Sequence, residues 1–101
     1  MKKLELVVSL NPGKSNEFKQ SLQNLSKKLQ DNSSSFIINE SDDTLSFSIL
    51  VRWETNAQMQ QALRSEEYKI LSGAINSLCK KTIVRLDDKQ VGNHISRLKS
   101  I

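Results

Sequence analysis

The sequence predicts an α+β fold in which helices cover one face of an antiparallel sheet. Alternating apolar residues mark four short strands along the 101-residue chain. Two stretches with apolar residues at helical spacing lie between the first and second strands and between the third and fourth, and the later stretch is divided in two. The resulting order, β-α-β-β-α-β, is that of the ferredoxin-like arrangement, and the length fits one domain.

The strands are expected over residues 4–10, 36–41, 45–54 and 80–87. Asn11-Pro12-Gly13 ends the first strand, and Asp42-Asp43 forms the turn of a hairpin between the second and third. The third strand has the clearest alternation. Its apolar face is formed by Leu45, Phe47, Ile49, Val51 and Trp53.

The first helix is expected over residues 14–30, because Phe18, Leu22, Leu25 and Leu29 form one narrow apolar stripe. In the later stretch, Thr55 with Gln58 is a capping-box pair for a short helix that ends near Leu63. Ser65 is expected to cap a second, more deeply buried helix. The apolar arc of that helix contains Tyr68, Ile70, Leu71, Ala74, Ile75, Leu78 and Cys79, and Gly73 in its interior indicates close backbone packing.

Residues 1–87 are therefore expected to form the domain, and residues 88–101 a C-terminal tail. In the tail, Val91, Ile95 and Leu98 have helical spacing, which favours a short helix that docks on the domain or on a partner subunit. The second face of the sheet carries Val7, Leu50 and Ile37 or its neighbours. This apolar area predicts a homodimer.

Charge and composition narrow the range of partners. The formal charge of +4 comes from scattered basic residues, several of them in last helical turns, so a solvated surface is expected rather than a nucleic-acid site. RNA-recognition modules share the topology but display aromatic residues on the open sheet face, whereas here those of the third strand lie on the helix face. No apolar run approaches the roughly 20 residues that a membrane helix needs. A charged N-terminus and the single Cys79 favour a cytoplasmic protein.

Three runs in the later half of the chain resemble the antibiotic-biosynthesis monooxygenase domain. They are Arg52-Trp53-Glu54-Thr55, Leu63-Arg64-Ser65-Glu66-Glu67-Tyr68 and Leu71-Ser72-Gly73-Ala74-Ile75. The family pattern is a Trp-Glu-Ser/Thr at the end of the third strand and, about twelve residues on, a Ser with an aromatic residue three positions later. The similarity spans roughly residues 3–87 and implies a dimeric α+β barrel, in which two ferredoxin-like sheets close against each other.

The resemblance implies a monooxygenase-like protein that acts on a quinol or another aromatic small molecule without metal or cofactor. It places Trp53 in a pocket, with Tyr68 as a second candidate. Ile49, Met59 and Ala62 occupy positions where various relatives carry Asn, Tyr and His. Because these three residues are apolar here, the alternative is a non-catalytic ligand-binding or interaction module of the same fold.

Residue chemistry alone names no catalytic group. Trp53 either stacks on an aromatic ligand or fills the gap between sheet and helix. Tyr68 either donates its phenol to a substrate or holds its hydroxyl at the rim of the domain. Cys79 is expected to be a small buried hydrophobe and His94 to be exposed. One His and one Cys form no metal-ligand set, so no metal is expected.

Overall fold

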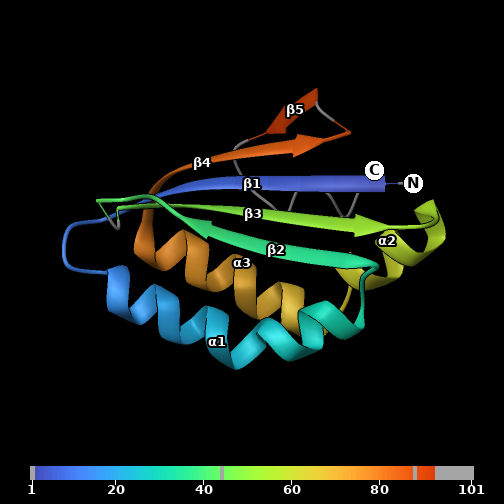
Figure 1. Ribbon diagram of the computed structural model, residues 1–101, viewed down its shortest axis with the longest axis horizontal. Coiled ribbons are helices and arrows are strands. Elements are labelled where there is room, and N and C mark those ends of the chain that lie inside the picture. The colour runs from blue at the N-terminus through green and yellow to red at the C-terminus, as the bar shows by residue number, and fades with distance from the viewer. Residues whose placement is uncertain (1, 44, 88, 93–101) are drawn as a thin grey trace.

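The fold consists of one antiparallel sheet with all its helices on one face (Figure 1). The computed structural model describes residues 2–43, 45–87 and 89–92. Its elements are β1 (Lys2–Leu10), α1 (Ser15–Asp31), β2 (Ser35–Glu40), β3 (Ser46–Trp53), α2 (Asn56–Leu63), α3 (Glu66–Leu78), β4 (Cys79–Leu86) and β5 (Lys89–Gly92). The strand order is β2-β3-β1-β4-β5, with every neighbouring pair antiparallel. The predicted ferredoxin-like arrangement is confirmed, with β5 added at one edge.

The core lies between the sheet and the helices. In the central strand β1, Leu6 is paired with Ile49 of β3 on one side and with Val84 of β4 on the other, and all three are fully buried. The predicted stripe of α1 is confirmed, since all four of its apolar residues are buried. Each such side chain contributes about 1.5–3 kcal/mol through removal from water. This burial fixes which face of every strand meets the helices.

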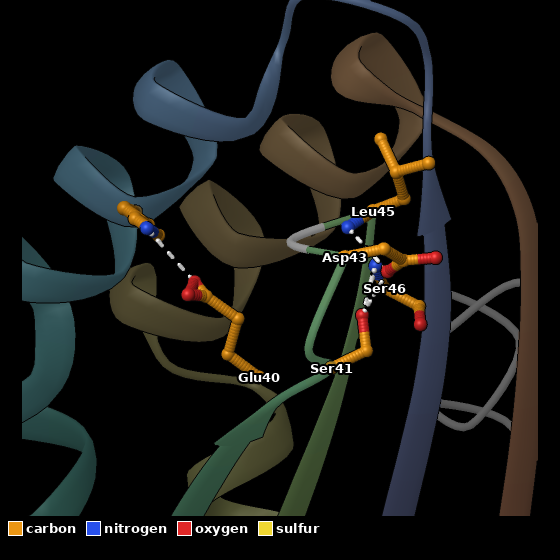
Figure 2. A network of polar contacts seen from close by, with 6 residues as sticks. Glu40, Ser41, Asp43, Leu45 and Ser46 are labelled. Carbon is orange, nitrogen blue, oxygen red and sulfur yellow. Dashed lines mark hydrogen bonds and ion pairs between the residues drawn. The ribbon is translucent and has the colours of Figure 1, made fainter.

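A compact polar turn connects β2 to β3, as the Asp42-Asp43 pair predicts (Figure 2). The Ser41 hydroxyl donates to Oδ1 of Asp43 at 2.6 Å, and the amide of Leu45 donates to the same oxygen at 3.0 Å. These bonds stabilise the carboxylate and lower the pKa of Asp43 below its ordinary value. The prediction for Leu45 is wrong: it precedes β3 and is 49% exposed, because its backbone belongs to the turn.

The two later helices begin in different ways. Thr55 caps α2 as predicted, since its Oγ1 accepts from the amide of Gln58 at 3.2 Å. The Gln58 side chain accepts from the backbone amide of Glu54. In a standard capping box it would accept from the amide of the N-cap residue, Thr55, one position later. Ser65 occupies the N-cap position of α3, but its side chain caps nothing there. Its hydroxyl instead donates to the carbonyl of Ala62 at 2.6 Å, which satisfies an end carbonyl of α2.

The chain after β4 turns back into a strand. Asp87 has φ 51° in this turn, a conformation that Asp tolerates better than most residues, and its side chain accepts from the amide of Lys3 at 2.9 Å. Lys89 then pairs with Leu86 in an antiparallel ladder. The helix predicted from the spacing of Val91, Ile95 and Leu98 is therefore wrong for residues 89–92, while residues 93–101, with His94, lie outside the described part. None of the helices in the described ranges is long and apolar enough to cross a membrane.

Gly73 does not mark close packing, contrary to the prediction. It is exposed in the interior of α3, and a Cβ built on its backbone would have no heavy atom within 4 Å, apart from the neighbouring and helix backbone atoms that any helical residue has. A glycine at position 73 therefore has a lower helix propensity than an alanine would have, and no packing contact compensates for it.

Gly73→Ala should raise the free energy of unfolding by roughly 0.5–1 kcal/mol, because Ala loses less backbone entropy in a helix. Urea denaturation followed by circular dichroism measures the change. Gly13→Ala is the matched control: Gly13 has φ +78° in open space, so the same substitution should destabilise the chain by about 1 kcal/mol. A destabilised Gly73→Ala variant would show that an unseen contact requires the glycine.

Candidate functional site

A pocket of about 430 Å³ lies where the C-terminal end of α1, the end of β3 and helix α2 meet. Its lining consists of Asp31, Asn32, Ser33, Ser34, Trp53, Glu54, Gln58, Gln61, Ala62 and Ser65. The hairpin brings these segments together, because β2 pairs antiparallel to β3 and so starts beside the end of β3. The amide of Ser34 donates to the carbonyl of Arg52 at 2.8 Å, which fixes the loop after α1 against β3.

Trp53 is the structural link between these segments. It is only 1% exposed, and its Nε1 donates to the carbonyl of Asn32 at 2.7 Å. Its ring packs on Tyr68 with centroids 6.1 Å apart and an interplanar angle of 50°. The indole thus fills the space between sheet and helices and ties the α1–β2 loop to β3, while part of it borders the pocket.

The other residues singled out from the sequence lie at different depths. Ala62 borders the pocket together with Trp53. Ile49, Met59 and Tyr68 belong to the buried core and are not among the pocket lining. The sequence therefore brings the five candidates into one region, but only two of them reach the pocket surface.

Most of the polar pocket residues were not found from the sequence. The stretch Asp31 to Ser34 is identifiable as a loop by composition, yet about twenty residues separate it from Trp53. The sequence indicates only a capping role for Gln58, and no sequence pattern points to Gln61. Hairpin register was the one signal that could have placed the loop beside Trp53, since it pairs Ser35 with Arg52.

Tyr68 carries a buried hydroxyl, rather than one at the rim of the domain. The side chain is 2% exposed, and within the described residues its hydroxyl has no hydrogen-bond partner. Burial disfavours the charged phenolate and raises the pKa of Tyr68 well above its ordinary value. The phenol is therefore neutral at physiological pH and cannot accept a proton from a substrate as phenolate.

Cys79 is half-buried and lies at the junction of α3 and β4, where it caps the helix and begins the strand. Burial raises the pKa of its thiol to about 11, so the thiolate is scarce near neutral pH. This agrees with a packing role and provides no nucleophile.

The pocket itself offers hydrogen bonding and two carboxylates. Of the described residues that line it, Asp31 and Glu54 alone are ionisable, and the other side chains are amides, hydroxyls, an indole and a methyl group. Among the described residues, no group of three His, Cys, Asp or Glu side chains is placed to hold a metal ion. The chemistry available is thus recognition of a polar or aromatic molecule and, through a carboxylate, proton acceptance.

Solved structures with the same fold include proteins named for a monooxygenase activity. One antibiotic biosynthesis monooxygenase matches with a TM-score of 0.78 and 16% identity over 87% of this chain and 97% of its own. A candidate antibiotic biosynthesis monooxygenase from Nitrosomonas europaea matches with a TM-score of 0.78 and 14% identity over 85% and 95%. A Bacteroides thetaiotaomicron protein of unknown function, described as a possible oxidoreductase, gives 0.75 and 13% over 89% and 96%.

No protein-family model and no curated protein matches the chain. At these low identities, the structural matches show that the chain has the ferredoxin-like fold of antibiotic biosynthesis monooxygenases. The fold resemblance inferred from the Trp53 to Ile75 runs is thereby confirmed.

Replacing Tyr68 and Trp53 by Phe should have opposite effects on stability. Tyr68→Phe removes a buried unpaired hydroxyl, so the free energy of unfolding should stay unchanged or rise by up to about 1 kcal/mol. Trp53→Phe removes the hydrogen bond to Asn32 and leaves a cavity. The free energy of unfolding of this variant should therefore fall by about 2–4 kcal/mol. Urea denaturation followed by circular dichroism tests both. A loss above about 1 kcal/mol in Tyr68→Phe would reveal a partner for the hydroxyl.

Proposed function

We propose that the chain binds a small aromatic molecule in the pocket beside Trp53. The observation that carries this proposal is the 430 Å³ pocket, a volume within the usual range for small-molecule sites of about 300–1,000 Å³. Trp53 and Ala62 supply apolar contact, and the side chains of Gln58 and Gln61 on α2 supply donors and acceptors for hydroxyl or carbonyl groups.

Oxidation of the bound molecule is the second candidate, favoured by the fold shared with proteins named antibiotic biosynthesis monooxygenase. In such a reaction the activated CH₂ group in the keto tautomer of a hydroquinone becomes a carbonyl. One atom of O₂ enters the product and the other leaves as water, so the substrate supplies all four electrons. The carboxylate of Asp31 or Glu54 would accept the proton that activates the substrate. The non-catalytic module differs only in lacking turnover.

Anaerobic calorimetry with a panel of hydroquinones, including 1,4-naphthohydroquinone, should detect binding, and oxygen uptake in air should detect turnover. Gln61→Tyr places a ring at the pocket and should weaken binding at least about tenfold. Gln20→Tyr is the matched control, since Gln20 is exposed on the early part of α1. Absence of binding by the whole panel would refute the pocket. Binding without oxygen uptake above that of buffer would support the ligand-binding module and rule out the oxygenase function.

We also propose that two copies associate through the sheet face opposite the helices, which no element covers in the described part of the chain (Figure 1). Val7 pairs with Ile83, and Leu50 pairs with Ile37, which is 43% exposed. These four residues form an apolar band across β4, β1, β3 and β2. A second copy of the same face would cover the band and produce an α+β barrel.

Light scattering should therefore show a dimer at micromolar concentration. Leu50→Arg puts a charge into the band and should yield a monomer that keeps its helix content. The control is Ile70→Arg on α3, which is 49% exposed on the helix side of the molecule and should leave the dimer intact. A monomeric parent chain, or a Leu50→Arg dimer, would contradict this interface.

A further inference from the structure

We infer that the ligand of the pocket beside Trp53 carries a positive charge, as an aromatic molecule with an ammonium group does. This inference rests on the proposed function, because it assigns the ligand of the same pocket. Among the described residues, the lining contains the carboxylates of Asp31 and Glu54 and no Lys, Arg or His. The pocket is therefore acidic in a chain whose formal net charge is +4.

Neither carboxylate forms an ion pair with another of the described residues. Five other acidic side chains are held in ion pairs with N–O distances from 2.9 to 3.9 Å: Glu5 with Arg85, Glu17 with Lys14, Glu40 with Lys19, Glu67 with Lys28 and Asp87 with Lys2. Within the ranges that the structure describes, no ion pair involves Asp31 or Glu54. Their charge is thus available to a ligand.

The helix ends around the pocket contribute potentials of both signs. The 17-residue helix α1 ends at Asp31, and Asp31 to Ser33 line the pocket, so the negative end of the helix dipole lies at its wall. The N-terminal ends of α2 and α3 oppose this effect, since Ser65, the N-cap residue of the 13-residue helix α3, also lines the pocket. The helix ends therefore offset one another. The two carboxylates then favour a cation over a carboxylate or phosphate.

Three catechols that differ in side-chain charge provide the test: dopamine, neutral 4-methylcatechol and 3,4-dihydroxyphenylacetate. Calorimetry under argon, at neutral pH and low ionic strength, measures their affinities. Dopamine should bind tightest and the carboxylate weakest, with a ratio between these two on the order of tenfold. Added salt should reduce the ratio, because both carboxylates are exposed.

The double variant Asp31→Asn/Glu54→Gln keeps the size of both side chains and should bring the affinities for dopamine and 3,4-dihydroxyphenylacetate together. Its matched control is Glu17→Gln/Asp42→Asn, which removes the same charge at the start of α1 and in the β2–β3 turn, at the opposite end of the molecule (Figure 1). The control should keep the preference for dopamine.

The outcomes separate this inference from the function on which it rests. The inference of a positively charged ligand would be overturned by equal affinities, by tighter binding of 3,4-dihydroxyphenylacetate, or by an unchanged preference in the double variant. Binding of 4-methylcatechol would still support the pocket in each of these cases. Failure of all three catechols and of 1,4-naphthohydroquinone to bind would overturn both proposals. Circular dichroism of each variant confirms that the fold is retained.

Discussion

The hydrogen bond from the indole of Trp53 to the carbonyl of Asn32 is the contact on which the site region depends. It joins the last residue of β3 to the loop that follows α1, in a space closed on the inner side by Tyr68. Because Trp53 is buried, an indole N–H without a partner would cost free energy, and the Asn32 carbonyl supplies that partner. The loop can then stand beside α2 and leave a pocket between them.

The same burial limits what Trp53 can do for a ligand. A residue that is 1% exposed offers an edge rather than a free face for stacking, so most recognition must come from the polar side chains around it. Tyr68 lies one layer deeper and is kept neutral by burial. Trp53 and Tyr68 therefore pack the core side of this region and keep the surrounding elements in place. The loop after α1 and helix α2 supply the hydrogen-bonding groups of the pocket.

The fold could be predicted from the sequence because burial imposes a period on each element. Phe47, Ile49 and Val51 alternate as a strand requires, and the stripe on α1 follows the helical repeat. Predictions failed where a single side chain had two options. Ser65 could cap α3 or bond back to α2, and only the position of the Ala62 carbonyl decides. The pocket is not predictable from the sequence, because its polar residues follow no period and meet only through the register of β2 on β3.

The locations of Ile49 and Met59 bear on how this chain differs from the proteins it resembles. The resemblance places polar side chains at these positions in some oxygenases, whereas here both residues are fully buried in the apolar core. A polar group there would need a partner inside the domain, and the unpaired Tyr68 hydroxyl shows how few partners that core supplies. For the proposed ligand, polar contacts would therefore come from the outer wall, where Asp31 and Glu54 lie without a counter-ion among the described residues. The proposal thus assigns ligand specificity largely to the loop after α1, whose side chains lie outside the apolar core.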